Sequence, residues 1–167
     1  NLLIDLGATA KGYATELVCD KLAEKGVTSA MLSAGGNVKV IGKPKDGRES
    51  WVIGIQNPEN AFGRSDEQIV KAINVKDASG VTSGNYQRYY IVDGNNYHHL
   101  IDPDTLMPGN YYSSVSIIAE DSGFADFLST AAFLLPFEES KKLVEENNAE
   151  AVWVMPDKSI VTTNGIE

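Results

Sequence analysis

Residues 29–119 read as a series of short strands separated by turns rich in Gly, Asn, Asp and Pro. The clearest turn is Asp93-Gly94-Asn95-Asn96, whose composition is typical of a β-hairpin. Apolar residues 2–6 run into Gly7 at the start of the chain, and we read them as the end of a buried strand. The strands expected after it cover residues 29–33, 38–41, 51–55, 69–75, 81–83, 88–92, 97–101, 114–119, 151–154 and 159–162.

Helical patterns lie on both sides of this central stretch. Residues 9–25 carry apolar side chains at helical spacing, so we expect a helix that buries this face. Residues 124–135 predict an apolar helix and residues 138–147 a surface helix. The sequence therefore predicts one α+β domain over residues 1–167, with mostly antiparallel sheet packed with helices. The apolar face expected on the first helix consists of Tyr13, Leu17, Val18, Leu22 and Ala23.

Composition narrows the possible partners. The 167 residues carry 14 Lys and Arg against 23 Asp and Glu, a net charge of −9, so we expect no nucleic-acid partner. Cys19 is the only cysteine, which excludes an internal disulfide and a cysteine-based zinc site. No apolar run approaches the ~18–20 residues of a membrane span. The chain begins at Asn1 in an apolar segment, so we expect a fragment of a longer protein.

Small residues dominate residues 5–13, where the expected strand turns into the first helix. They allow a ligand to approach the backbone, and a helix N-terminus favours an anion. Lys11 adds a positive charge that the helix dipole disfavours unless an anion lies nearby. A tight turn with a solvated lysine is the alternative. Gly35 and Gly36 likewise suit either close ligand approach or a plain turn.

Both histidines of the chain, His98 and His99, are neighbours in an expected strand. Neighbouring strand residues point to opposite faces, so only one of the two can face a given pocket. A histidine close to Asp102 could act as a general base near neutral pH. Packing at a half-buried position is the alternative for both.

Asp126 and Thr130 are four residues apart in the apolar helix, so their oxygens lie on one face about one turn apart. A carboxylate and a hydroxyl are hard ligands of the kind that Mg²⁺ takes, with phosphates or waters completing the octahedron. The alternative is capping by Asp121 or Ser122, with Asp126 favoured by the dipole at the helix start.

These clusters occur in a fixed order that resembles the ApbE family of FAD:protein FMN transferases, known in older usage as thiamine biosynthesis lipoproteins. No single block is specific, but the ordered set is, and it runs along almost the whole chain. It covers only the C-terminal portion of the family's length. The blocks are DLGATAKGYA at residues 5–14, AGGN at 34–37, WVIGI at 51–55, TSG at 82–84, YQRY at 86–89, HLIDP at 99–103 and ADFLST at 125–130.

The resemblance implies a T-fold-like α+β architecture and Mg²⁺-dependent transfer of FMN from FAD to a Thr or Ser of an acceptor flavoprotein. It implies that the metal is held by Asp126, Thr130 and the backbone oxygen of Ala8. His99 would deprotonate the accepting hydroxyl. FAD would be contacted by Asp5, Lys11 and Ile101.

Two other activities remain open beside the transferase. An FAD pyrophosphatase would use the same metal site to release FMN and AMP, with water in place of the acceptor. A non-catalytic module would hold the flavin without turnover. By resemblance, the full-length protein is expected to be exported and membrane-anchored as a lipoprotein. One departure from the family pattern is Leu106, which stands where Gly usually follows Asp-Pro-x-Thr.

Overall fold

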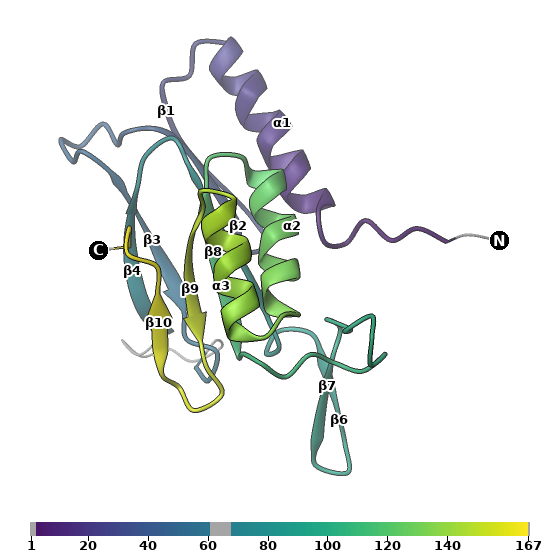
Figure 1. The fold of residues 1–167 in the computed structure, drawn as a ribbon. Helices are drawn as coiled ribbons and strands as arrows, with labels where there is room; N and C mark the ends of the chain where they lie inside the picture. The colour runs from purple at the N-terminus through teal and green to yellow at the C-terminus, as the bar shows by residue number, and fades with distance from the viewer. Residues whose placement is uncertain (1–2, 61–67, 167) are drawn as a thin grey trace.

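The computed structural model describes residues 3–60 and 68–166. Strands and helices follow one another in an order that confirms the predicted α+β class (Figure 1). The helices are α1 (Ala10–Glu24), α2 (Ser122–Phe133) and α3 (Phe137–Glu146). The strands are β1 (Ser29–Ala34), β2 (Asn37–Gly42), β3 (Trp51–Gln56), β4 (Ile69–Val75), β5 (Ser79–Gly84), β6 (Tyr89–Val92), β7 (Asn95–His98), β8 (Ser114–Ala119), β9 (Glu150–Val154) and β10 (Ile160–Thr162).

The main sheet has six strands in the order β1-β2-β5-β8-β9-β10, and each neighbouring pair is antiparallel. Two further antiparallel ribbons, β3–β4 and β6–β7, complete the described strands. The β6–β7 ribbon projects from the body of the molecule, and Asp93 and Gly94 form its two-residue turn, both at positive φ (Figure 1). The predicted antiparallel pairing and the hairpin are therefore confirmed, but the second hairpin strand is Asn95–His98 and not the predicted residues 97–101.

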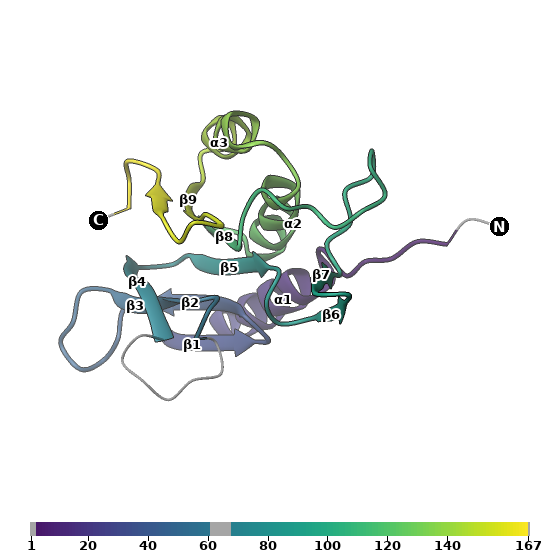
Figure 2. The same ribbon diagram turned by 90° about the horizontal axis from the view of Figure 1, so that it is seen from below.

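Two hydrophobic clusters pack against the main sheet. One lies between its strands and helices α2 and α3, with Ile117, Phe133 and Trp153 fully buried in it. The other joins Val40 and Val152 of the sheet to the side chains of the β3–β4 ribbon. Seen from below, α2 and α3 lie on one side of β5 and β8 (Figure 2). This layering places the C-terminal half of α2 beside the end of β5, where Ser83 contacts Ser129 and Thr130.

The predicted buried strand before Gly7 is wrong for the residues that the structure describes. Residues 3–6 are exposed and pair with no strand in residues 3–60 and 68–166. Leu3 is 95% exposed and Ile4 is 72% exposed. An apolar run predicts burial only if another element covers it, and none of the described elements does.

The predicted inner face of α1 is also wrong. Tyr13, Leu17 and Val18 are all exposed, whereas the buried residues of the helix are Gly12, Thr15 and Cys19. Small side chains let α1 approach α2 closely. A Cβ atom on Gly12 would overlap the Ser122 carbonyl oxygen and lie 2.6 Å from the Cβ of Asp126. Close helix packing, rather than burial of the largest side chains, therefore sets the orientation of α1.

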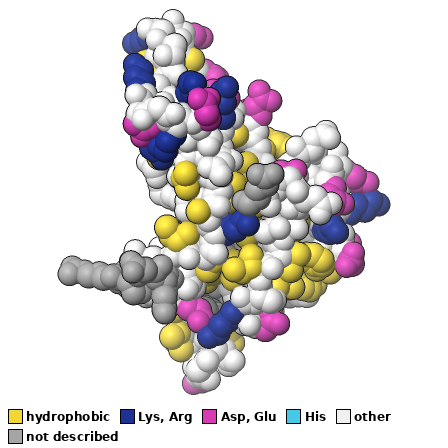
Figure 3. All heavy atoms as spheres, turned by 90° about the vertical axis from the view of Figure 1, so that its left-hand side faces the viewer, with side chains coloured by type: hydrophobic (Ala, Val, Ile, Leu, Met, Phe, Trp, Pro, Cys, Tyr) yellow, Lys and Arg dark blue, Asp and Glu magenta, His cyan; other side chains and the backbone are white. Residues whose placement is uncertain are grey.

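Surface charge is mixed on the side that carries β3, β4 and β10. Among the described residues on this face, blue Lys and Arg side chains alternate with magenta Asp and Glu, and both signs gather at the upper end formed by α1 (Figure 3). No helix in the described part of the chain has the length and apolar character needed to cross a membrane.

Replacing Gly12 by Ala should lower the free energy of unfolding by about 1–3 kcal/mol, because the new methyl group overpacks the α1–α2 contact. At an ordinary helix position the same substitution would stabilise the helix by about 0.5–1 kcal/mol. Urea unfolding monitored by circular dichroism measures the difference.

Tyr13→Ala, at the adjacent exposed position, is the matched control and should change the free energy of unfolding by less than about 1 kcal/mol. A Gly12→Ala protein as stable as the parent would show that the two helices have room to separate.

Candidate functional site

A cavity of about 450 Å³ opens where the N-terminus of α1, the end of β5, the start of the β6–β7 ribbon and α2 meet. Its lining includes every residue for which the sequence predicts a role in the site. Three separate segments of the chain supply them, so the fold brings together residues far apart in sequence. These residues are Asp5, Ala8, Lys11, His99, Ile101, Asp126 and Thr130.

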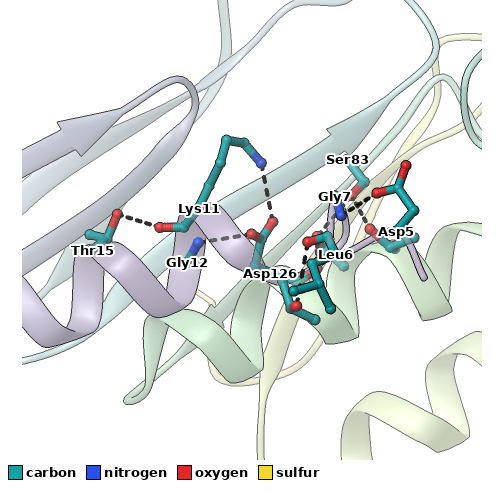
Figure 4. A network of polar contacts seen from close by, with 11 residues as sticks. Asp5, Leu6, Gly7, Lys11, Gly12, Thr15, Ser83 and Asp126 are labelled. Carbon is teal, nitrogen blue, oxygen red and sulfur yellow. Dashed lines mark hydrogen bonds and ion pairs between the residues drawn. The ribbon is translucent and has the colours of Figure 1, made fainter. Parts of the chain in front are cut away.

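Asp126 is the most buried charged side chain of the cavity, with 3% of the residue exposed. Its Oδ2 accepts a hydrogen bond of 2.8 Å from the backbone N–H of Gly12, and its Oδ1 lies 3.5 Å from the Lys11 ammonium (Figure 4). Gly12 is in the first turn of α1, where backbone N–H groups lack partners within the helix. The side chain of the N-cap residue Thr9 makes no capping bond. Asp126 thus caps α1 from another helix.

The start of α2 is fixed separately. Asp121 is its N-cap, and the Asp121 carboxylate accepts a hydrogen bond from the Phe124 N–H. Glu16 of α1 accepts a hydrogen bond from the Ser122 N–H, and the nearly buried Lys39 ammonium donates to the Glu16 carboxylate. Capping by Asp121 is therefore real, but it leaves Asp126 free to face the cavity.

Hydroxyl groups surround the position one turn after Asp126. The Thr130 Oγ1 lies 3.2 Å from Ser83 Oγ at the end of β5, and Ser83 also contacts Ser129. Among the described residues, no three His, Cys, Asp or Glu side chains gather into a metal-binding cluster. A metal at this cavity would instead take one carboxylate, a hydroxyl and backbone or ligand oxygens, a donor set that suits Mg²⁺.

The two histidines have opposite environments, as their alternation predicts. Nε2 of His98 lies 2.8 Å from the carbonyl oxygen of Gly109, and Nδ1 accepts from the Leu100 N–H. Its ring also packs edge-on against Phe133. With both nitrogens paired in the core, His98 is structural, and burial lowers its pKa from the ordinary value of 6.5.

His99 lines the cavity, and its Nδ1 lies 3.3 Å from the carbonyl oxygen of Arg88. A carbonyl oxygen can only accept, so Nδ1 carries the proton and Nε2 keeps its lone pair. Desolvation lowers the pKa of His99; the Arg88 carbonyl opposes this, and the nearby charges of Arg88 and Lys11 add to the lowering. The lowered pKa favours the neutral form of the ring, which a base requires.

Asp5 and Ile101 border the same cavity at its exposed rim. The Asp5 carboxylate accepts a hydrogen bond from the Gly7 N–H, which shapes the turn before α1 (Figure 4). Asp102 does not contact either histidine ring. It accepts from the Asp104 N–H and the Thr105 hydroxyl, and these bonds lower the pKa of its carboxyl.

The ApbE family model matches residues 1–153 of the chain. The chain belongs to the ApbE family. Curated relatives named FAD:protein FMN transferase include one from Treponema pallidum, 37% identical over 98% of this chain and 46% of its own length. One from Klebsiella pneumoniae is 33% identical over 96% of this chain and 48% of its own length.

Solved ApbE structures agree with the fold. The apbe protein of Thermotoga maritima is 38% identical with a TM-score of 0.83, over 97% of this chain and 52% of that chain. The flavinyl transferase ApbE of Pseudomonas stutzeri is 32% identical with a TM-score of 0.77, over 97% and 49%. This chain therefore spans about half the length of the ApbE proteins that it matches.

Arg88 is the one charged lining residue of this ApbE-family chain to which the sequence analysis assigned no role. Its guanidinium has no hydrogen-bond or ion-pair partner among the described residues. Its carbonyl holds His99. The signal in the sequence was its place in the YQRY block, but a single arginine on a short strand is more often at the surface. Ser83 was likewise visible only as part of the TSG block.

Leu106 occupies a left-handed backbone conformation with φ of 57°, in the turn that follows Ile101. This conformation costs an ordinary residue roughly 1–2 kcal/mol, whereas Gly adopts it freely. Gly, the residue that the family resemblance leads us to expect here, would avoid this strain. Leu106 is also 75% exposed, so little packing would be lost on its removal.

We expect Leu106→Gly to raise the free energy of unfolding by up to about 1 kcal/mol, after the extra entropy of Gly in the unfolded chain is subtracted. Leu106→Ile should lower it, because a branched Cβ fits this conformation least well. Thermal unfolding of the three proteins tests the order, and a destabilised Leu106→Gly protein would contradict it.

Proposed function

We propose that this protein transfers FMN from FAD to a Thr or Ser hydroxyl of an acceptor protein, with Mg²⁺ as the metal. The observation that carries the proposal is one cavity that brings together a buried carboxylate, a neighbouring hydroxyl, two cationic side chains and a histidine with a lowered pKa. The names of the relatives support the same reaction.

The residues present fit a magnesium ion. The Asp126 carboxylate already faces a cation, the Lys11 ammonium, so its position suits positive charge. Thr130 lies one turn further along α2, and Ala8 lies in the turn before α1 on the same cavity. When bound, Mg²⁺ would neutralise charge on the phosphate oxygens of FAD and stabilise the leaving phosphate.

His99 acts on the acceptor. Its Nε2 lone pair takes the proton from the accepting hydroxyl, whose oxygen then forms a bond to the FMN phosphorus. The bond between that phosphorus and the bridging oxygen breaks, and AMP leaves with this oxygen. The Arg88 carbonyl stabilises the imidazolium through Nδ1 and keeps the ring oriented during the step.

Lys11 and Arg88 bring positive charge to the cavity for the diphosphate, while Asp5 and Ile101 would contact the flavin nucleotide at its rim. Such local charge lets a protein of net charge −9 bind an anionic substrate. By the same resemblance, we propose that the full-length protein is exported and membrane-anchored. FAD hydrolysis, in which water replaces the acceptor, is the second candidate, because it needs the same residues.

Asp126→Asn should reduce Mg²⁺-dependent release of AMP from FAD by about 100-fold or more, because it removes the negative charge that holds the metal. Asn can still accept the Gly12 N–H, so the cap on α1 is kept. The measurement titrates residues 1–167 and the full-length protein with FAD, with and without Mg²⁺, and quantifies FMN and AMP.

Asp121→Asn is the matched control, because Asn caps helices as well as Asp does and Asp121 does not line the cavity. Its activity should equal that of the parent. Unchanged AMP release by the Asp126→Asn protein would remove Asp126 from the metal site. When a purified acceptor protein is added to the same assay, FMN attached to it supports transfer, and free FMN alone supports hydrolysis.

His99→Gln should slow FMN transfer by about 100- to 10,000-fold while FAD affinity changes little, because the general base is lost and the binding groups remain. The transfer rate of the parent should fall as the pH drops through the pKa of His99, below the ordinary 6.5, since the base works only when neutral. The readout is covalent flavin fluorescence of a purified acceptor protein across a pH series.

Tyr97→Phe, on the adjoining strand β7, serves as the control and should keep both the rate and its pH dependence. If His99→Gln weakened FAD binding as much as it slowed transfer, His99 would be a binding residue. An acid limb that persisted in the His99→Gln protein would assign the titration to another group.

A further inference from the structure

The cation that faces Asp126 in this structure is the Lys11 ammonium. Its Nζ lies 3.5 Å from Asp126 Oδ1, and the lysine side chain arches over the carboxylate from the first turn of α1 (Figure 4). The Asp126 side chain is 4% exposed, whereas the Lys11 side chain is 50% exposed. One partner of this ion pair is therefore fixed in the core, and the other reaches it from solvent.

The two carboxylate oxygens of Asp126 have different partners. Oδ2 accepts the Gly12 N–H at 2.8 Å and is part of the α1–α2 contact. Within residues 3–60 and 68–166, Oδ1 is held only by Lys11. A metal ion ligated by Asp126 without breaking the helix contact would therefore use Oδ1, the oxygen that the ammonium now faces.

Lys11 can leave this position when a metal ion takes its place beside Asp126. Its backbone is anchored in α1, where its carbonyl accepts a hydrogen bond of 2.8 Å from the Thr15 hydroxyl, so only the side chain needs to move. The ion pair is long at 3.5 Å and its ammonium is half-exposed, so the ammonium can move into solvent once another cation pairs with the buried Asp126 carboxylate. Lys11 lines the cavity, so its four-carbon side chain can swing within it.

We propose that Lys11 is an internal stand-in for the metal ion. It neutralises Asp126 until Mg²⁺ binds at Oδ1, and the displaced ammonium then pairs with the anionic diphosphate of the substrate. This inference rests on the proposed function, because it assumes the same metal site and the same substrate.

Coupling between the two ligands follows from this exchange. Metal binding frees the ammonium for the diphosphate, and a bound diphosphate draws the ammonium away from Asp126, so each ligand strengthens binding of the other. Lys11 thus opposes the metal when the cavity holds no anion and supports substrate binding when it does.

The test is the affinity of the 167-residue chain for Mg²⁺ alone, measured by isothermal titration calorimetry without nucleotide. Lys11→Met should tighten Mg²⁺ binding by roughly three- to tenfold, because it removes the competing cation and keeps the length of the side chain. Arg88→Met is the matched control. It removes a cation that lines the same cavity without contacting Asp126, and it should change the affinity by less than about twofold.

A second measurement follows the exchange directly. Lysine labelled with ¹³C at Cε should give one resonance that is absent in the Lys11→Met protein, and this resonance should move when MgCl₂ is added. In the Lys11→Met protein, Mg²⁺ binding should also depend on Asp126, so adding Asp126→Asn should abolish it.

Equal Mg²⁺ affinity in the parent and the Lys11→Met protein would overturn the inference while leaving the metal site intact. Equal tightening by Lys11→Met and Arg88→Met would also overturn it, because general charge repulsion would then explain both. An unmoved Lys11 resonance in a chain that binds Mg²⁺ would do the same. Absence of Mg²⁺ binding in all of these proteins would instead contradict the proposed metal site itself.

Discussion

The rest of the site depends on one hydrogen bond, from the Gly12 N–H to the Asp126 carboxylate across the contact between α1 and α2. It caps a helix whose own N-cap side chain makes no such bond, and it holds the buried carboxylate at the edge of the cavity. Because Gly12 has no side chain, the two helices approach closely enough for this bond to form. The same hydrogen bond therefore serves the packing of the helices and the position of the carboxylate in the site. The Lys39–Glu16 pair, with its link to the Ser122 N–H, stabilises the same crossing from the other side.

The two adjacent histidines at the end of the β6–β7 ribbon have different roles, one structural and one chemical. Strand alternation sends His98 into the core, where both ring nitrogens are paired, and leaves His99 on the cavity with one nitrogen fixed by the Arg88 carbonyl. Burial and nearby cations lower the pKa of His99. The same cations would disfavour the imidazolium that forms when His99 accepts a proton. A negatively charged substrate would offset them and so make the proton transfer easier. The charge of the cavity and the basicity of His99 are thus linked.

Strands bounded by clear turns, such as β4 and β8, were predictable because turn chemistry and alternation are local. The site residues were predictable only from the order of the blocks, since the spacing of Asp126 and Thr130 alone also suits an ordinary helix. The inner face of α1 was not predictable from hydrophobicity. The buried residues Gly12, Thr15 and Cys19 are small. Whether a small side chain is needed at a position depends on how closely α2 packs there, and the local sequence does not encode this distance.

A carboxylate that serves as a helix cap is a suitable metal ligand for a physical reason. The backbone N–H of Gly12 fixes the orientation of the carboxylate before any ion arrives, so orienting it adds no further cost on binding. The same preorganisation would trap a bare negative charge in the core if nothing neutralised it. Lys11 supplies that neutralisation from a half-exposed position. Because this ion pair is long, an incoming metal ion can replace the ammonium. The charge of the buried carboxylate is then balanced by Lys11 before the metal binds and by the metal afterwards.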